Sequence, residues 1–370
     1  MKIIFTSVAF RFFNSEVKIG GGEMSNRDLI YSLSGDNSVY IISAYGGGGW
    51  AVNRDGVISY EVASLLRKWL PFEPLTVFIA KVFYRAFALY KIKQLKPDIL
   101  LGGTYSANVI FKYKKKNRNC RTGFFIRAFE NLRSSKKWEG GKAIVYGGYG
   151  VQIIKEMDFV IVNSQFMRNT CLSYGLKESC LNIIYPGVSI DSHTNKKGKS
   201  KKIKMISTSV DKGFDIFSQL SKKFPNYQFE VAGDSSVEGS EKITENLTVY
   251  GWLNNPRDFI GDADLFLVPS RVEETFGRVA VEAIQLNVPT LVSNAGGLPE
   301  TVNNNDLFIV KDTNIDSWIE KLNFFLNTCN EEEINASFSD IKNKSNDYRI
   351  ENQISAWKEI VKKEYMKGNV

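Results

Sequence analysis

The chain has 370 residues, which is too long for one average domain and favours two. With 43% hydrophobic residues it can bury two ordinary cores, which argues against global disorder. Its 48 basic and 40 acidic residues give a net charge of +8, and this surplus favours anionic partners such as sugar nucleotides, a phospholipid surface or nucleic acid.

The cysteines indicate neither a disulfide framework nor a zinc site. No two of them form a CxxC pair, and no histidine cluster lies near them. They are typical of the reduced thiols of a cytoplasmic protein. They are Cys120, Cys171, Cys180 and Cys329.

No membrane span or signal peptide is expected. The chain has no uncharged apolar run of about 18 residues. Its apolar start ends at Arg11 without a small-residue cleavage site, so this start is better interpreted as a buried strand.

Apolar runs alternate with helical segments in the first half, which predicts α/β layers around a parallel sheet. Helices are expected from about residue 25 and over 164–174. The expected strands are 2–10, 38–43, 99–102, 121–126 and 158–163.

A polar, basic segment at 191–202 predicts a solvated linker and therefore a domain boundary. We predict an N-terminal domain over 1–190 and a C-terminal domain over 203–349. A C-terminal helix at about 350–370 is expected to pack back on the first domain.

The strand–helix alternation then restarts. Helices are expected at 215–223 and 277–286, and the stretch 331–366 is helical and charged. The expected strands are 204–208, 227–232, 247–250, 264–268, 290–293 and 307–310.

The most informative segment is 268–283, where a strand ends at Pro269, a loop carries a carboxylate and a helix begins at Gly277. Ligands of open α/β sheets lie just beyond the carboxyl ends of the strands, and helix N-termini there favour anions. Glu274 in the loop and Glu282 in the helix suit neutral hydroxyls, such as those of a sugar and a ribose.

The order Pro-Ser-x3-Glu-Thr-Phe-Gly-x4-Glu-Ala in this segment resembles the retaining glycosyltransferases of family 4, as do the next segments at 287–290 and 294–300. The resemblance implies the GT-B fold, in which two Rossmann-like domains with parallel sheets face each other across a cleft. It also implies a donor site in the C-terminal domain.

Further segments extend the resemblance. Gly20-Gly21-Gly22-Glu23 is similar to the family's N-terminal glycine loop, which approaches the donor diphosphate. The segments 158–164 and 184–188 resemble those that close the N-terminal domain. Asp211-Lys212-Gly213 matches a Lys-Gly turn, whose ammonium would neutralise the diphosphate as the sugar leaves.

Two departures from the family pattern stand out. The family commonly has Gly-Arg before the Lys-Gly turn, whereas this chain has 207–209 as Ser-Thr-Ser, so Arg278 or another arginine would have to compensate. Many members carry an acceptor-side histidine, but the only histidine here is His193, in the linker. The aligned region, 126–130, makes Arg127 and Glu130 candidates for acceptor or sugar contacts, with ordinary surface charges as the alternative.

The resemblance implies Lys212 and Glu274 as catalytic residues. Metal and cofactor are not expected, because no Asp-x-Asp pair suited to metal–diphosphate binding stands out. The expected donor-binding residues are Gly21, Gly22, Ser209, Lys212, Trp252, Leu253, Glu274, Thr275, Phe276, Gly277, Arg278 and Glu282.

The predicted function is retaining, hexosyltransferase-type transfer from a nucleoside-diphosphate sugar to a hydroxyl of a glycan or lipid-linked acceptor, in bacterial cell-surface polysaccharide or glycoconjugate synthesis. The alternatives are a catalytically silent GT-B partner of another transferase and a sugar-nucleotide epimerase. A nucleic-acid-binding protein is disfavoured because the basic runs lack a recognised binding module. The expected location is cytoplasmic, with the inner face of the plasma membrane as a peripheral site.

Two basic stretches bear on membrane binding. The run 112–121 is either a solvated helix end or a surface attracted to anionic lipid. In 75–93, aromatic and aliphatic residues recur at helical spacing beside Lys81, Arg85 and Lys91. This segment is either a helix that fills a core or a basic amphipathic surface that lies on an anionic membrane.

Overall fold

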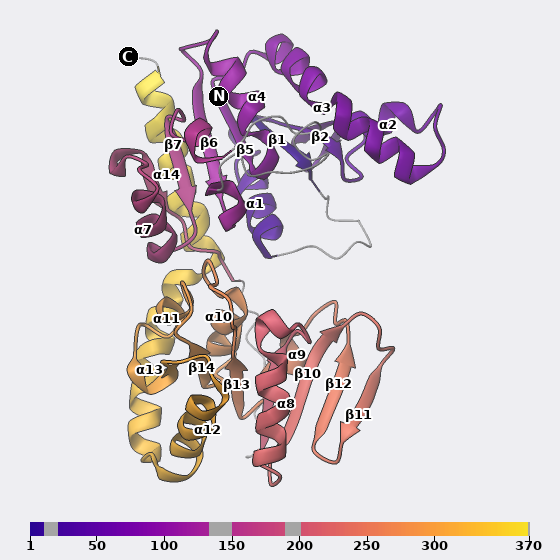
Figure 1. Cartoon of the computed structure of the whole chain (residues 1–370). Coiled ribbons are helices and arrows are strands. Elements are labelled where there is room, and N and C mark those ends of the chain that lie inside the picture. The colour runs from indigo at the N-terminus through magenta and orange to yellow at the C-terminus, as the bar shows by residue number, and fades with distance from the viewer. Residues whose placement is uncertain (11–20, 133–149, 189–200, 369–370) are drawn as a thin grey trace. The chain divides into compact units, whose positions relative to one another are not determined.

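A computed structural model describes residues 1–10, 21–132, 150–188 and 201–368. The chain divides into two compact units, Met1–Pro186 with Glu351–Val370, and Gly187–Ile350 (Figure 1). The predicted linker 191–202 lies outside the described residues except for Lys201 and Lys202, and Lys202 already begins a strand. Each unit is described by itself.

The first unit contains an eight-stranded sheet within its described residues, with the order β3-β4-β2-β1-β5-β6-β7-β8. All neighbouring strands are parallel except the edge pair β3–β4. The strands are β1 (Lys2–Ala9), β2 (Ser38–Tyr45), β3 (Trp50–Arg54), β4 (Val57–Glu61), β5 (Ile99–Gly103), β6 (Arg121–Ile126), β7 (Phe159–Val162) and β8 (Leu181–Ile183).

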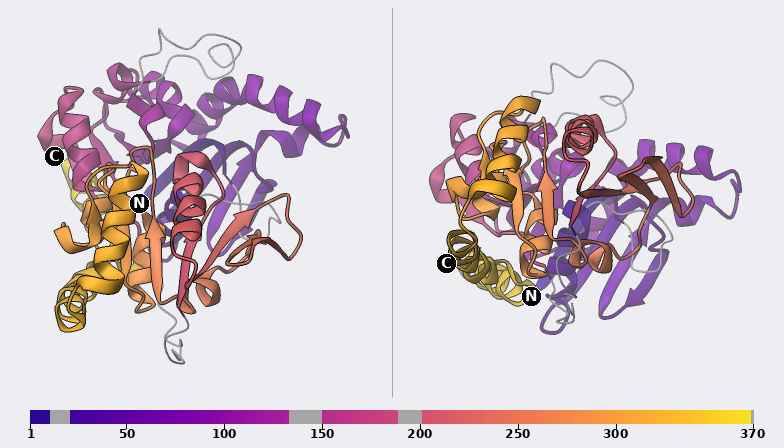
Figure 2. Two further views of the ribbon diagram at one scale, coloured as in Figure 1. Left: turned by 60° about the horizontal axis from the view of Figure 1, so that its bottom comes forward. Right: turned by 90° about the horizontal axis from the view of Figure 1, so that it is seen from below.

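Both faces of the central strands of this sheet are buried, which explains why those strands appear in the sequence as continuous apolar runs. In β1, Ile3 and Phe5 pack in a core with α1 and the C-terminal helix, whereas Ile4 packs in a second core with α3, α4 and α7. The ribbon views show helices on both sides of this sheet (Figures 1 and 2). The helices of this unit are α1 (Gly21–Tyr31), α2 (Val62–Leu66), α3 (Glu73–Leu95), α4 (Ala107–Lys114), α6 (Val151–Ile154), α7 (Gln165–Ser173) and α14 (Ile350–Gly368).

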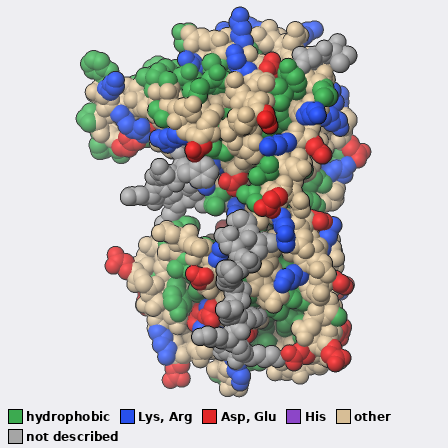
Figure 3. Space-filling model, turned by 180° about the vertical axis from the view of Figure 1, so that it is seen from behind, with side chains coloured by type: hydrophobic (Ala, Val, Ile, Leu, Met, Phe, Trp, Pro, Cys, Tyr) green, Lys and Arg blue, Asp and Glu red, His purple; other side chains and the backbone are tan. Residues whose placement is uncertain are grey.

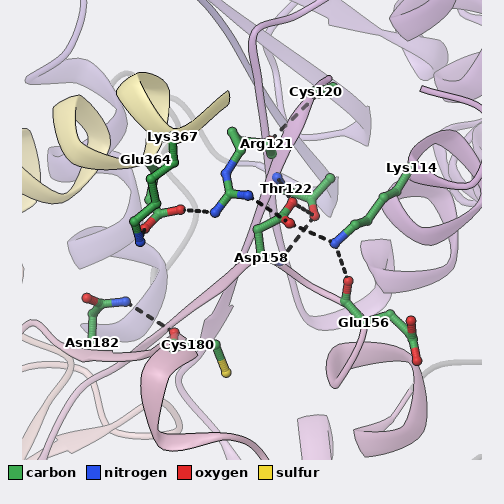
Figure 4. A network of polar contacts seen from close by, with 10 residues as sticks. All are labelled: Lys114, Cys120, Arg121, Thr122, Glu156, Asp158, Cys180, Asn182, Glu364 and Lys367. Atoms are coloured by element: carbon green, nitrogen blue, oxygen red, sulfur yellow. Dashed lines mark hydrogen bonds and ion pairs between the residues drawn. The ribbon is translucent and has the colours of Figure 1, made fainter. Parts of the chain in front are cut away.

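The C-terminal helix α14 is fixed to the first unit by buried contacts. The indole N–H of Trp357 donates to the Leu29 carbonyl at 3.0 Å, and the Trp357 ring lies 5.3 Å from that of Phe125. Arg121 bridges Glu364 of this helix and Asp158, whose Oδ1 also accepts from Lys114 Nζ at 3.0 Å (Figure 4). These ion pairs therefore use two cations of the basic run 112–121 inside the fold.

The second unit contains a seven-stranded sheet, counted over its described residues, with the order β11-β12-β10-β9-β13-β14-β15. Only the edge pair β11–β12 is antiparallel. The strands are β9 (Lys202–Ile206), β10 (Gln228–Asp234), β11 (Ser240–Thr244), β12 (Leu247–Gly251), β13 (Leu265–Val268), β14 (Thr290–Ser293) and β15 (Ile309–Val310). The helices are α8 (Phe214–Lys223), α9 (Arg257–Gly261), α10 (Arg278–Gln285), α11 (Leu298–Thr301), α12 (Ile315–Asn323) and α13 (Glu331–Ser345).

The predicted α/β class with two parallel-dominated sheets is confirmed, but some strands differ from the expected ones. Four strands have no counterpart among the expected ones: the outer pair β3–β4 of the first sheet, its other edge strand β8, and the edge strand β11 of the second sheet. The expected strand 204–208 is displaced by two residues, because β9 runs from Lys202 to Ile206. The stretch 331–366 is helical as expected, and a 3₁₀ turn at Asn346–Tyr348 divides it into α13 and α14. In the described part of the chain, no helix is long and apolar enough to cross a membrane.

Candidate functional site

The strand order of the second unit reverses at β9. From β9 the chain continues to β10 on one side, and β13 lies on the other side. Because these strands are parallel, their carboxyl ends share one edge of the sheet. Open parallel sheets bind ligands where the strand order reverses. The loops after β9 and β13 are therefore the expected position of a site.

The loop after β9 carries Lys212 at the end of a short 3₁₀ turn, Val210–Lys212. The next residue, Gly213, has φ of 84°, and a Cβ there would lie 1.9 Å from the Pro269 carbonyl oxygen at the end of β13. Only glycine permits this close approach. The tight turn thus places Lys212 directly beside the loop that follows β13.

That second loop carries Glu274, which forms an ion pair with Lys212. The same carboxylate oxygen, Oε1, accepts a hydrogen bond of 2.8 Å from the hydroxyl of the buried Ser270. The Glu274 carbonyl accepts from the Gly297 amide at 2.7 Å, which fixes the loop backbone against the turn after β14. Among the described residues, both side-chain contacts of Glu274 fall on Oε1, so Oε2 remains available to a ligand.

A second acid–base pair lies one step further along the motif. Arg278 begins α10, and its Nε donates to Glu282 Oε1 at 2.8 Å, one helical turn later. Its Nη1 is buried without a hydrogen-bond partner in the described part of the chain. Both carboxylates of the motif are thus paired with a cation at the switch point of the sheet.

Arg271 joins the two loops and was not singled out from the sequence. Its amide donates to the Asp211 carbonyl at 2.9 Å, and its guanidinium pairs with Asp215 at the start of α8. The hydrogen bond from Arg271 holds the pKa of the Asp215 carboxyl below its usual value. A lone arginine in a loop does not indicate such a bridge in the sequence. The sequence likewise does not indicate that Ser270 binds Glu274.

The residues that replace the family's Gly-Arg also have an unusual geometry. Ser207 has φ of 88°, in the left-handed region that favours glycine, and its Oγ accepts from the amide of the exposed Ser209 at 3.2 Å. Thr208 Oγ1 donates to Asp234 Oδ2 at 3.1 Å at the end of β10. The expected strand at 207–208 is therefore a turn, and its side chains bring hydroxyls but no positive charge.

The other predicted donor residues of this unit lie on the same edge or support it. Trp252 and Leu253 follow β12, two strands from β9 and hence about 10 Å away along the edge. Thr275 is half-buried between Glu274 and Phe276. The Phe276 ring is buried against Tyr348, with 5.2 Å between ring centroids, so this side chain supports the loop. Gly277, with φ of 113°, precedes the first turn of α10.

The remaining candidates belong to the first unit. Gly21 and Gly22 begin α1, and Gly20 lies outside the described residues, as does His193. Arg127 follows β6, where its Nε donates to Asn26 Oδ1 at 3.1 Å and its Nη1 to the Ile184 carbonyl at 3.4 Å. Arg127 is half-buried, and burial lowers its pKa to about 10. Glu130 is half-buried in the 3₁₀ turn Phe129–Leu132.

Solved structures establish the class of fold. A crystal structure of HepE from Anabaena in complex with UDP and glucose matches with a TM-score of 0.68 and 16% identity, over 98% of this chain and 100% of that chain. Two parallel-dominated α/β units with this likeness define the GT-B fold of glycosyltransferases.

A family model matches most of the second unit. Residues 192–339 match the family described as "Glycosyl transferases group 1", and this range includes Lys212, Glu274, Arg278 and Glu282. The match spans most of the second unit, which is therefore similar to a group 1 glycosyltransferase domain.

Curated relatives match over part of their length. An "Uncharacterized 41.2 kDa protein in cps region" of Klebsiella pneumoniae is 27% identical over 54% of this chain and 59% of its own length. The "O-antigen biosynthesis glycosyltransferase WclY" of Escherichia coli is 31% identical over 22% of this chain and 25% of its own length. The chain thus spans less than two thirds of these relatives.

Proposed function

We propose that the protein is a retaining glycosyltransferase of the family 4 type, which moves a sugar from a nucleoside-diphosphate donor to a hydroxyl of a glycan or lipid-linked acceptor. The observation that supports this most is the pairing of Lys212 with Glu274 and of Arg278 with Glu282 at the switch point of the second sheet. The names of the relatives from the cps region and from O-antigen biosynthesis favour a role in bacterial surface polysaccharide synthesis.

The two pairs suit the two chemical parts of such a donor. A diphosphate would draw Lys212 away from Glu274 and would accept hydrogen bonds from the first amides of α10, which have no acceptor within the helix. Glu274 would then hold sugar hydroxyls and Glu282 the ribose hydroxyls, because a carboxylate accepts hydrogen bonds from neutral donors.

Arg278 is our candidate for the missing diphosphate arginine. Its Nη1 is buried and lacks a hydrogen-bond partner among the described residues, at the N-terminal end of α10. A buried donor of this kind costs free energy until an acceptor arrives. A phosphate oxygen would satisfy it, while Nε keeps its bond to Glu282.

In the proposed reaction the bond from the anomeric carbon to the diphosphate breaks, and a bond from that carbon to the acceptor oxygen forms on the same face of the sugar. The departing diphosphate takes the proton of the acceptor hydroxyl, so that no protein nucleophile is required. Lys212 and the α10 amides would stabilise the negative charge that develops on the leaving group.

A thermal-shift screen against nucleoside diphosphates and their sugars tests the proposal. A ligand at about 100 times its Kd should stabilise the protein by about 2.7 kcal/mol. Product analysis with glycan and lipid-linked acceptors then separates the classes. Transfer supports the proposal, acceptor-independent conversion of the donor indicates an epimerase, and donor binding without turnover indicates a silent partner. If no nucleoside diphosphate or its sugar stabilises the protein, the proposal is wrong.

A further inference from the structure

Exposed apolar side chains concentrate on one segment of the first unit. The described residues leave fifteen large apolar side chains exposed, and eight of them lie between residues 65 and 90. Trp69 is 84% exposed and Phe72 is 66% exposed in the turn between α2 and α3. Patches of this kind on a folded protein usually mark an interaction surface. The α2–α3 patch comprises Leu65, Trp69, Phe72, Leu75, Phe78, Val82, Phe83 and Tyr90.

The geometry of α3 shows that the patch is not part of the core. The buried residues of this helix recur every four positions, from Thr76 through Tyr84 to Ile92. On the opposite side of the helix lie Phe78 at 58% and Val82 at 43% exposure. Thus α3 is apolar on two faces, and the unit buries only one. The core-helix interpretation of 75–93 explains the inner face alone.

Positive charge surrounds the exposed stripe. Lys68 and Lys93 are exposed, and Arg85 follows Phe78 and Val82 at i+7 and i+3, so it lies along the same side of the helix. Lys81 and Lys91 lie over the rings of Tyr45 and Tyr60, at 4.9 and 4.1 Å from the ring centroids. Figure 3 shows hydrophobic and basic side chains together on the projecting α2–α3 segment.

The only acidic residue of the segment 62–95 is neutralised within the fold. Glu73 pairs with Arg67 at 2.9 Å, and Arg67 also binds the buried Glu61 at 2.8 Å. The hydrogen bond from Arg67 lowers the pKa of Glu73, so the pair persists at neutral pH. The patch therefore presents apolar side chains to its surroundings, beside Lys68, Arg85 and Lys93, which form no ion pair with any described residue.

We propose that the α2–α3 patch docks this protein on an anionic lipid bilayer. Tryptophan and phenylalanine at the projecting turn would enter the boundary between headgroups and acyl chains, where such rings are favoured. Lys68, Arg85 and Lys93 would meet anionic headgroups, which match their charge. The run 112–121 contributes less than its sequence predicts, because Lys114 and Arg121 are paired with Asp158. This proposal is independent of the proposed function.

Vesicle co-sedimentation tests the proposed membrane docking. The full chain is mixed with phosphatidylcholine vesicles that contain or lack phosphatidylglycerol. The apolar variant replaces Trp69, Phe72 and Phe78 with serine. Its matched control replaces Tyr174, Ile243 and Phe324 with serine, since these side chains are also exposed but lie outside the patch. A third variant replaces Lys68, Arg85 and Lys93 with glutamine. Thermal unfolding and far-UV circular dichroism confirm that each variant is folded.

The wild-type chain and the control should bind the anionic vesicles, and the apolar variant should partition at least about tenfold more weakly. The glutamine variant should lose most of the dependence on phosphatidylglycerol and on salt. The proposal is overturned if the wild-type chain does not bind anionic vesicles at low salt, or if the apolar variant binds as well as its control. It is also overturned if the patch variants instead change the mass of the protein in solution, because a second copy would then be the occupant.

Discussion

Replacing Lys212 with alanine should separate the stability of the fold from catalysis. The side chains of Lys212 and Glu274 are 41% and 19% exposed, and an ion pair with this solvent access stabilises a fold by at most about 1 kcal/mol. Loss of a charge that stabilises a leaving group costs about 2.7 to 4 kcal/mol in activation free energy. The variant should therefore unfold within roughly 4 °C of the wild type but turn over at least about 100-fold more slowly.

Calorimetric unfolding measures the stability of the fold. Turnover is measured as the release of nucleoside diphosphate from the donor that the thermal-shift screen identifies. Lys222→Ala is the matched control, because it removes an exposed lysine from the far end of α8. Lys212→Arg keeps the charge and should recover part of the activity. A folded Lys212→Ala protein with turnover within about threefold of the wild type would remove Lys212 from the mechanism.

Three further predictions follow from the geometry of the second unit and from the buried thiols. Glu282→Gln should weaken nucleoside-diphosphate binding by about tenfold, the scale of one charged hydrogen bond. Glu274→Gln should leave that affinity nearly intact but impair sugar transfer. Titration calorimetry measures the affinity of each variant, and a turnover assay measures the transfer. Gly213→Ala should destabilise the second unit by more than about 2 kcal/mol, as followed by chemical unfolding, because its Cβ would collide with a carbonyl at positive φ. Cys120 and Cys171 should resist thiol reagents at pH 8 in the native protein and react after unfolding, because burial raises the pKa of each to about 12.

Each has a clear contrary result. Equal loss of nucleoside-diphosphate affinity in Glu282→Gln and Glu274→Gln would contradict the division of roles between the two carboxylates. A Gly213→Ala protein as stable as the wild type would show that the turn does not need its close approach. Rapid labelling of Cys120 or Cys171 in the native protein would place those thiols at the surface.

The strands of the two sheets were predictable where they are buried on both faces. Runs such as Arg121–Ile126 and Thr290–Ser293 match β6 and β14 at both ends, because a parallel strand between two helix layers is apolar throughout. Edge strands lack this signal. Half-buried residues alternate with exposed ones in β3 and with buried ones in β4. The sequence pattern did not distinguish this hairpin from a loop.

Within the site, the sequence indicated the residues of the motif but not their partners. The spacing of Glu274 and Glu282 placed one in a loop and one in a helix, as the structure does. The pairing of Lys212 with Glu274 depends on the adjacency of β9 and β13, which are 59 residues apart between Ile206 and Leu265. Ser207 was assigned to a strand because its left-handed backbone is uncommon for serine and leaves no mark in the sequence.

Hydrogen–deuterium exchange with and without a saturating nucleoside diphosphate tests the central claim, that the switch point of the second unit binds the donor. The account predicts slower exchange in two segments, 207–213 after β9 and 274–280 at the start of α10, and less of this protection in the Lys212→Ala protein. If the exchange rates of both segments are unchanged while the ligand is bound, the donor lies elsewhere and the central claim is wrong.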